Sequence, residues 1–523
     1  MRRRHLKPLR VAVALVFLAG LTAAFADFRG LVPARLGHWL AAVQFTPSLL
    51  ALGSGAAALF VFAGLIGVTL AFGRVYCSTV CPLGLLQDAI ARIAAWLRPR
   101  RRLLPFRPGS IWLRYGSLVA AILTIAGGAE TIAYAHADPY SNFGRIVSGL
   151  FRPLLAAANN TLVTPAAALG LGWLYRVPPP WPGLAVLVPA AIMLALVAGL
   201  AVWRERIYCN TLCPLGTLLG LLARGSAFRL ALDRSSCTRC AECVRVCKAQ
   251  CLDLRTGAID ASRCVACFNC VTACPEQGVG YRLAWTRRSA VPVPASPPSA
   301  GPSRREFLAA TTTALAAAAG ASRLFAATAT GGPPPQNSSR AISQPGAAGV
   351  GRFLERCTAC QLCVSACPTH VLQAASVEYG FAGFMKPRLD YTAAFCNFDC
   401  RRCGEVCPTG AIARLDLADK QVTRIGLARL DLEKCIVKTK GTDCAACSEH
   451  CPTKAVDTIP YGENLRLPQV TDDLCIGCGA CEYACPAQPQ KAISVAGRWR
   501  HERAVRRVEG KAKDPRKQND FPF

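Results

Sequence analysis

The spacing of its cysteines constrains this chain more than any other feature. Four stretches have the pattern CxxCxxCxxxC, and two more carry an altered form of it. In such a pattern three thiolates hold three corners of a [4Fe-4S] cluster and the fourth cysteine reaches a second cluster, so the motifs fold in pairs. The chain is therefore predicted to bind six [4Fe-4S] clusters through 24 of its 29 cysteines.

The first two motifs form one predicted pair. No histidine lies within them, which disfavours a zinc site. Cys247 is followed by Lys248 rather than proline, so Cys251 is an alternative fourth ligand, although Cys247 is preferred. The two expected ligand sets are Cys237, Cys240, Cys243 and Cys274, and Cys264, Cys267, Cys270 and Cys247.

Four further groups occupy the last 170 residues. Two regular motifs, at Cys357 and Cys475, flank two irregular ones, at Cys396 and Cys435. This order favours a nested pairing, and a sequential pairing would exchange only the fourth ligands. The nested sets are Cys357, Cys360 and Cys363 with Cys485; Cys475, Cys478 and Cys481 with Cys367; Cys396, Cys400 and Cys403 with Cys451; and Cys435, Cys444 and Cys447 with Cys407.

Long apolar segments precede the cysteine motifs. The chain is 52% hydrophobic, unlike a small secreted disulfide scaffold. About 20 apolar residues span the hydrocarbon core of a bilayer, and basic residues beside such segments favour the cytoplasmic face. Residues 153–175 are also uncharged but contain Asn159 and Asn160, which predicts an external or re-entrant segment. The predicted spans are residues 11–26, 50–73, 115–137 and 184–203.

A short pattern occurs twice, after the second and fourth apolar segments. The two stretches are Arg74-Val75-Tyr76-Cys77-Ser78-Thr79-Val80-Cys81-Pro82-Leu83-Gly84 and Arg206-Ile207-Tyr208-Cys209-Asn210-Thr211-Leu212-Cys213-Pro214-Leu215-Gly216. This repeat predicts a duplicated helix pair with both CxxxCP motifs at one membrane face. The gap of three residues places two thiols on one face of a helical turn, suited to a metal half-site, a reversible disulfide or a thiolate relay; packing of the helix ends is the plainer alternative.

A region rich in Pro, Ala, Ser and Gly separates the two sets of cluster motifs. Within it, Ser303-Arg304-Arg305-Glu306-Phe307-Leu308 has the form of a twin-arginine export signal. The groups beyond this signal are therefore predicted to face the periplasm. The predicted domains are a membrane domain (1–230), a cytoplasmic two-cluster ferredoxin domain (231–285), a linker whose signal segment is either cleaved or kept as a fifth helix (286–350), a periplasmic four-cluster domain (351–500) and a basic tail (501–523).

The formal charge of +29 does not indicate nucleic-acid binding, because many basic residues lie beside the apolar segments. Membrane lipid is the expected neighbour. The predicted fold class is a membrane α-helical bundle of four helices, with a fifth if the signal is retained, plus α+β ferredoxin-like dicluster domains. The expected location is the bacterial inner membrane, with cluster domains on both sides.

The two halves of the chain resemble two known families. Residues 1–290, with two CxxxCP motifs and a two-cluster ferredoxin, resemble the NapH/MauN and polyferredoxin membrane proteins. Residues 303–500 resemble the NapG/MauM ferredoxin-type proteins on the motifs that begin at Cys435 and Cys475. The chain thus looks like a fusion of the two, which together resemble a quinol dehydrogenase that supplies a periplasmic reductase.

Three functional hypotheses follow. No CxxCH haem motif is present, and no glycine-rich dinucleotide fingerprint follows a plausible strand, which leaves quinol as the expected electron donor. Glu130, His136 and Asp138 are candidate proton acceptors for it. The first hypothesis is a membrane quinol dehydrogenase that passes electrons to a periplasmic oxidoreductase of the nitrate-reductase type or to cytochrome c. The second is a redox assembly factor that reduces a metal or a disulfide in a partner, and the third is a quinone-independent membrane ferredoxin.

Overall fold

The structure is a computed structural model. It describes residues 5–97, 106, 109–126, 137–170, 174–177, 181–284, 341–380, 383–462 and 464–506. The chain forms two compact units. The first comprises residues 1–334, 352–387 and 402–413, and the second comprises residues 335–351, 388–401 and 414–523. The region 351–500, predicted as one domain, is therefore divided between the two units.

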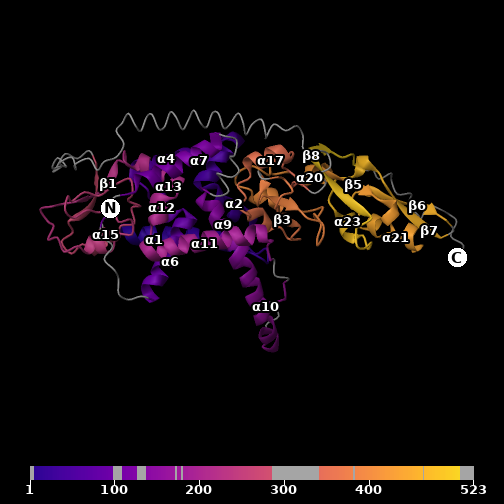
Figure 1. Cartoon of the computed structure of the whole chain (residues 1–523), viewed down its shortest axis with the longest axis horizontal. Coiled ribbons are helices and arrows are strands. Elements are labelled where there is room, and N and C mark those ends of the chain that lie inside the picture. Colours follow the sequence, from indigo (N-terminus) through magenta and orange to yellow (C-terminus); the bar gives the residue numbers. More distant parts are fainter. Residues whose placement is uncertain are drawn as a thin grey trace, which may run out of the picture. The chain divides into compact units, whose positions relative to one another are not determined.

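Apolar helices form the middle of the first unit (Figure 1). Among the described residues, α1 and α11 are the two helices long and apolar enough to cross a membrane, and α4, α7 and α13 are shorter apolar helices. The helices before the ferredoxin motifs are α1 Leu6–Ala26, α2 Ala34–Ala42, α3 Phe45–Leu50, η2 Ala51–Ser54, α4 Ala56–Phe72, α5 Tyr76–Thr79, α6 Pro82–Leu97, α7 Ile111–Ala126, α9 Pro139–Ile146, η3 Val147–Phe151, α10 Arg152–Ala168, α11 Leu184–Arg204, α12 Ile207–Thr211 and α13 Pro214–Ala223.

These helices differ in part from the predicted spans. The second span begins at Ala56 rather than residue 50, because Gly55 has a φ of 143° and separates α4 from η2. The third begins at Ile111, and residues 127–136 lie outside the described part of the chain. The stretch predicted as external contains the helix α10, which projects from the rest of this unit (Figure 1). The described residues thus contain two helices that are long and apolar enough to span a membrane, and the predicted bundle of four is not confirmed.

Each CxxxCP motif lies between two helices. The first cysteine belongs to a short helix, α5 or α12, and the proline begins the next helix, α6 or α13. Proline suits the first turn because its missing N–H would have no intrahelical partner there. Cys213 caps α13 by accepting a hydrogen bond from the Gly216 N–H, with 3.3 Å between N and Sγ. The motif therefore fixes both cysteines at helix ends.

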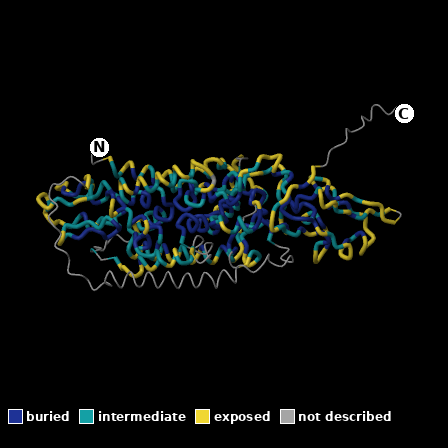
Figure 2. The backbone as a smooth tube through the Cα atoms, turned by 90° about the horizontal axis from the view of Figure 1, so that it is seen from above, coloured by how far each residue is buried: buried dark blue, intermediate teal, exposed yellow. Residues whose placement is uncertain are grey.

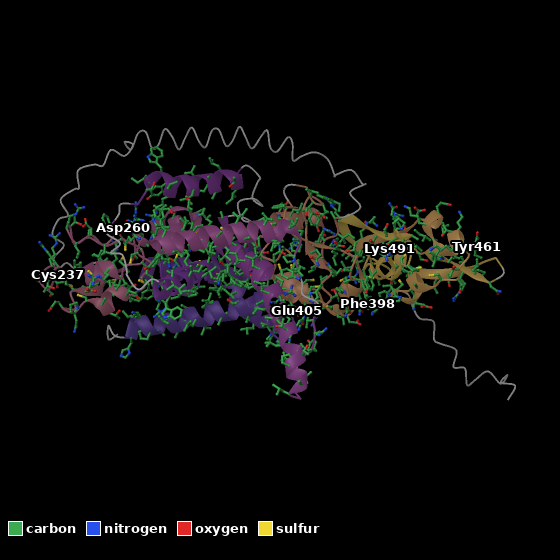
Figure 3. The ribbon with its side chains drawn as sticks, turned by 60° about the horizontal axis from the view of Figure 1, so that its bottom comes forward. Cys237, Asp260, Phe398, Glu405, Tyr461 and Lys491 are labelled. Carbon is green, nitrogen blue, oxygen red and sulfur yellow. The ribbon has the colours of Figure 1, made fainter. Side chains whose placement is uncertain are left out.

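A small ferredoxin fold lies at one end of the helices of the first unit, and β3 lies near the opposite end (Figure 1). In the ferredoxin fold β1 and β2 are antiparallel, with Phe228 opposite Leu283 and Leu232 opposite Val279. Asp260 lies on the side facing the helices and Cys237 at the outer end (Figure 3). The elements are β1 Phe228–Leu232, α14 Glu242–Arg245, α15 Asn269–Ala273 and β2 Val279–Leu283, and later in the same unit α18 Leu362–Ala366, β3 Leu372–Ala374 and α19 Arg402–Val406.

The second unit is built on two antiparallel strand pairs. β5 pairs with β8, with a register shift between Arg424 and Gly426, and β6 pairs with β7 in a hairpin that carries Tyr461 near its tip (Figure 3). Its elements are α20 Leu417–Val422, β5 Thr423–Leu430, η5 Leu432–Lys434, α21 Ile436–Lys440, α22 Ala446–Glu449, β6 Val456–Tyr461, β7 Leu465–Val470, η6 Asp472–Leu474, α23 Ala480–Ala484 and β8 Ile493–Arg503; α17 Val350–Arg356 and β4 Pro387–Leu389 contain residues of both units. The cysteine loops line the buried interior, which is dark blue in Figure 2.

Candidate iron-sulfur centres

The first ferredoxin set lines one pocket. The four thiols predicted for one cluster surround it together with Leu232, Leu254 and Pro275. Burial, followed by the nearby thiol of Cys274, raises the pKa of Cys243 to about 11. We refer to these residues as the Cys237 group: Cys237, Cys240, Cys243 and Cys274.

The second set lies closer to the helices and has five cysteines near it. The Sγ atoms of Cys247 and Cys251 are 3.8 Å apart, and Cys251 also interacts with Cys264. Either thiol of this pair can donate to the other, so the shared proton lowers the pKa of one and raises the pKa of its neighbour. A ligand to iron must be a thiolate, and Cys247 stays the predicted fourth ligand with Cys251 as the neighbouring thiol. The Cys264 group is Cys264, Cys267, Cys270 and Cys247.

The turn after Cys247 supports the same assignment. Gln250 has a φ of 50° and its N–H bonds to the Cys247 carbonyl at 3.2 Å. The turns after fourth cysteines 274, 367 and 451 repeat this arrangement, with positive φ at Gln277, His370 and Lys454. Lys248 thus occupies the place that proline takes elsewhere without changing the local fold.

The regular motifs share an unusual backbone. In each, the residues just before and just after the second cysteine have a positive φ, which non-glycine residues rarely adopt. Such left-handed pairs turn successive N–H groups into a concave nest that suits an anionic group, including an iron-sulfur site. The pairs are Arg239 and Ala241, Ala266 and Phe268, Ala359 and Gln361, and Gly477 and Gly479. This backbone fits a [4Fe-4S] cluster better than a chance gathering of thiols.

The structure differs from the nested pairing of the last four groups. Burial raises the pKa of Cys363 well above its usual value, and the neighbouring thiols that raise it further include Cys407 rather than Cys485. Cys363 and Cys407 lie in the first unit, whereas Cys485 lies in the second. The Cys357 group is therefore Cys357, Cys360, Cys363 and Cys407.

The second unit holds the complementary arrangement. One pocket is lined by Cys435, Cys444, Cys447 and Cys485, which form the Cys435 group. Burial raises the pKa of Cys481, and thiols near it include Cys451 as well as its own motif. The Cys475 group is Cys475, Cys478, Cys481 and Cys451. The motifs thus pair in sequence order, because motif pairing depends on which loops pack together and not on similarity of spacing.

The remaining group has Cys396, Cys400 and Cys403. Its residues divide between the two units, so Cys367 stays a prediction as its fourth ligand. Within the second unit the Cys396 N–H donates to the Cys478 carbonyl at 3.0 Å. This bond joins the loops of the Cys396 and Cys475 groups directly.

The four thiols of the repeated motifs converge. We call Cys77, Cys81, Cys209 and Cys213 the CxxxCP centre; each is 4% exposed. Cys81 interacts electrostatically with the other three thiols. The Gln87 amide donates to the Cys209 Sγ at 3.1 Å, and the Gly216 N–H donates to the Cys213 Sγ. The duplicated halves therefore meet at their cysteines.

Two buried arginines cross between the halves. Arg74 donates to the Cys209 carbonyl at 3.0 Å and lies 3.8 Å from the Cys77 Sγ. Arg206 mirrors it, with 2.6 Å to the Cys77 carbonyl and 4.0 Å to the Cys209 Sγ. Each arginine thus touches the thiol of its own motif and the backbone of the other. Asp88 breaks the symmetry, because it pairs with Arg206 at 2.8 Å and with Lys248 at 3.1 Å.

The environment of the CxxxCP centre does not suit thiol exchange with a partner protein. Reactive cysteines are accessible and have a lowered pKa. Here burial raises the pKa of Cys81, Cys209 and Cys213, and little thiol surface is exposed. The second functional hypothesis, reduction of a disulfide in a partner, gains no support from this arrangement.

The predicted quinol residues are only partly described. Glu130 and His136 lie outside the described residues. Asp138 is the N-cap of α9, where its carboxylate accepts from Thr46 and from Ser141 at 2.7–2.9 Å. Such a fully bonded carboxylate is a structural cap rather than an evident proton acceptor.

A cavity that sequence reasoning missed lies at the end of α1. It is lined by residues of α1, α2, α18 and α19 that include Ala24, Gly37, Leu362 and Val406. Leu362 and Val406 adjoin Cys363 and Cys407, so this cavity borders the Cys357 group. The sequence signals this site only through Asp27 and Pro33, which indicate a turn between α1 and α2.

Comparison with protein families supports iron-sulfur binding throughout. A family described as a 4Fe-4S dicluster domain matches residues 356–411, in agreement with the sequential pairing. Families described as 4Fe-4S binding domains match residues 234–250 and 467–492, and one such family matches residues 54–103 and again 185–232. No solved structure matches.

Known proteins match each half separately. The ferredoxin-type protein NapG of Escherichia coli is 33% identical over 29% of this chain and 68% of its own length, and MauM of Methylorubrum extorquens is 34% identical over 31% and 74%. MauN of Paracoccus denitrificans, a methylamine utilization ferredoxin-type protein, is 32% identical over 34% of this chain. The chain spans about half (48%) of the length of that MauN.

These findings define an iron-sulfur electron-transfer protein of the ferredoxin type. The chain belongs to the NapG/MauM family of ferredoxin-type proteins and joins to it an N-terminal part that is similar to MauN.

Proposed function

We propose that this chain is a membrane quinol dehydrogenase that delivers electrons to a periplasmic oxidoreductase. The observation that carries the proposal is the arrangement of the first unit, in which apolar helices separate a ferredoxin fold from the Cys357 group (Figure 1). A [4Fe-4S] cluster, when bound, accepts and releases one electron at a time. The six cluster-binding groups would carry the two electrons of a quinol one at a time, and its two protons would be released to water.

Exposed apolar side chains support insertion in a membrane. Phe60 on α4, Trp112 on α7 and Ile192 on α11 are 76%, 73% and 64% exposed. A soluble protein rarely exposes such patches without a partner surface. Lipid would cover these faces, and the twin-arginine motif supports export of the groups that follow it.

The cavity beside the Cys357 group is the proposed quinol site. It lies at the end of the apolar helix α1 and borders cluster-binding loops. Arg402 and Asp27 are the charged residues in its wall.

The test uses full-length protein purified anaerobically in detergent. A reduced benzoquinol or naphthoquinol analogue should bleach the cluster absorbance. Gly37→Leu, which fills the cavity, should slow this bleaching roughly 10- to 100-fold but leave reduction by dithionite unchanged. Gly64→Leu is the control, because a side chain added at Gly64 meets open space on α4. Bleaching by dithionite but by neither quinol would exclude the proposal.

Sidedness has its own test. After cluster removal in spheroplasts, a membrane-impermeant thiol reagent should label Cys444 but not Cys240, which is exposed in the ferredoxin fold. Labelling of Cys240 without permeabilisation would place the ferredoxin fold outside and contradict the proposed topology.

A further inference from the structure

The CxxxCP centre is not used by the six predicted clusters. Yet the same 4Fe-4S binding family matches residues 54–103 and 185–232, and each match contains one CxxxCP motif and no CxxCxxC motif. One motif supplies two cysteines, which is half of the ligand set of a cluster. The duplication therefore supplies one complete set.

The geometry of the two halves agrees with a shared site. An added Cβ at Gly84 would lie 2.6 Å from the Cys77 carbonyl, and one at Gly216 would lie 2.2 Å from the Cys209 carbonyl. Both glycines thus allow the following helix to approach the first cysteine of its motif. Hydrogen bonds from Gln87 and Gly216 to sulfur are of the kind that stabilise cluster thiolates.

Charge distinguishes a cluster from a pair of disulfides. Arg74 is fully buried, and no carboxylate in the described part of the chain forms an ion pair with it. Its guanidinium contacts Asn210, the Ser262 carbonyl and the centre itself. A buried cation without an anion is costly. Disulfides are neutral and leave this charge unbalanced, whereas a cluster held by four thiolates carries a net negative charge.

We propose that Cys77, Cys81, Cys209 and Cys213 together hold a seventh [4Fe-4S] cluster, between the halves of the duplicated helix pair. One electron enters this site from one neighbouring group and one leaves for the next, and no bond or proton is exchanged. Arg74, Gln87 and Arg206 act as positioning residues that balance or bond the thiolates.

Contacts link this site to the ferredoxin side. Arg74 donates to the Ser262 carbonyl at 3.1 Å, two residues before Cys264. Asn210 donates to the Ala249 carbonyl at 3.4 Å, within the loop that joins Cys247 to Cys251. The Cys264 group is therefore the neighbour on this side.

Contacts also extend toward the Cys357 group. The Tyr76 hydroxyl, next to Cys77, donates to Gln44 at 3.0 Å, and the nearby Thr46 donates to Asp138 at 2.8 Å. Asp138 caps the helix that carries Tyr140. On the same helix, a Cβ added at Gly144 would lie 2.4 Å from the Cys360 carbonyl, so this helix packs directly on the Cys357 group. The proposed site thus stands between the two cluster-bearing ends of the first unit.

Iron and acid-labile sulfide per chain test the proposal in full-length protein purified anaerobically. Replacing both Cys81 and Cys213 by Ser should lower each count by about four per chain. Thr79→Ser is the control, because it alters a buried residue of the first motif without removing a thiol and should leave both counts unchanged. Unchanged counts in the double variant, loss of one zinc ion per chain, or disulfides within the motifs of the anaerobic wild-type protein would overturn the proposal.

A second variant covers the case in which the double variant does not fold. Gln87→Leu removes one donor to the Cys209 sulfur and introduces the residue type found at the matching position, Leu219. Iron content should stay at the wild-type value, while one reduction potential falls, because a lost N–H donor disfavours added negative charge. Unchanged potentials in all EPR-detected titrations would contradict the proposed ligand set. Neither measurement depends on quinol, so failure of the quinol test leaves this one intact.

Discussion

The Cys237 group and the CxxxCP centre lie in the same unit but position their thiols with different parts of the chain. The Cys237 group sits on loops at the outer end of a small ferredoxin fold, with Cys240 exposed and left-handed residues on both sides of it. The thiols of the CxxxCP centre come from helix ends, are 4% exposed, and face two buried arginines. The Cys237 group thus relies on backbone N–H groups, whereas the CxxxCP centre lies against side-chain cations.

The largest expected effect comes from removing the buried cation that lies against the CxxxCP centre. Arg74→Met should destabilise the protein by about 3–5 kcal/mol, as for one partner of a buried ion pair. Melting temperature in detergent and iron per chain would measure this, and both should fall. Arg245→Met is the control, since its ion pair with Glu242 in the ferredoxin fold is 44% and 39% exposed and should contribute about 0–1 kcal/mol. Equal melting temperatures for the two variants would remove the distinction between the two environments.

The two glycines of the repeat should respond next most strongly. An added methyl at Gly216 or Gly84 would meet a cysteine carbonyl oxygen at 2.2 or 2.6 Å. Such overpacking costs about 1–3 kcal/mol, and Gly216→Ala should exceed Gly84→Ala. The control Gly64→Ala meets open space and should not destabilise. Thermal melting of the three variants would rank them, and a stable Gly216→Ala variant would contradict the close approach.

These expectations show which features sequence could supply. The ligand triplets follow from local spacing, and the structure brings Cys274 to its expected partners because the two motifs are adjacent in the chain. Sequence could not assign the fourth ligands of the later groups, because each fourth cysteine there is followed by proline, and only tertiary packing places Cys407 and Cys485.

The repeat was equally informative and equally limited. It predicted that Cys77 and Cys209 occupy matching positions, but not that Arg74 and Arg206 cross between the halves. Crossing depends on how the two halves pack together, which no local pattern encodes. The cavity beside Gly37 was missed for the same reason, since its walls come from four separate helices.

Low pH should destabilise the surroundings of the CxxxCP centre more than the ferredoxin fold. Although burial acts to raise the pKa of Asp88, the Arg206 guanidinium and the Lys248 ammonium hold it well below its usual range. A carboxyl group with a lowered folded-state pKa stabilises the protein above the unfolded pKa near 4, and this contribution is lost as the pH falls below it. Wild-type protein should therefore lose roughly 1.4 kcal/mol per pH unit below about pH 4 from this group alone.

Helix melting followed by circular dichroism between pH 3 and pH 5 would measure this loss. Asp88→Asn should flatten the dependence. Asp233→Asn serves as the control, because Asp233 pairs with Arg282 at 3.2 Å in the solvent-accessible ferredoxin fold and should change the dependence less. The opposite ranking would show that the Asp88 ion pairs do not form.

The smallest effect should have the opposite sign and belong to the ferredoxin fold. Ala241 has a φ of 62°, a conformation that costs a residue with a Cβ about 1 kcal/mol but costs glycine little. Ala241→Gly relieves that strain. Glycine also raises the conformational entropy of the unfolded chain, which offsets part of the gain, so the expected net stabilisation is about 0–1 kcal/mol. Ala273→Gly at the end of α15 is the matched control and should lose up to about 1 kcal/mol, because its backbone is helical. Chemical denaturation of the holoprotein, monitored by loss of cluster absorbance, would compare the two. If Ala241→Gly were as unstable as Ala273→Gly, the left-handed nest would not be the backbone of the Cys237 group, and the contrast with the arginine-balanced centre would lose its basis.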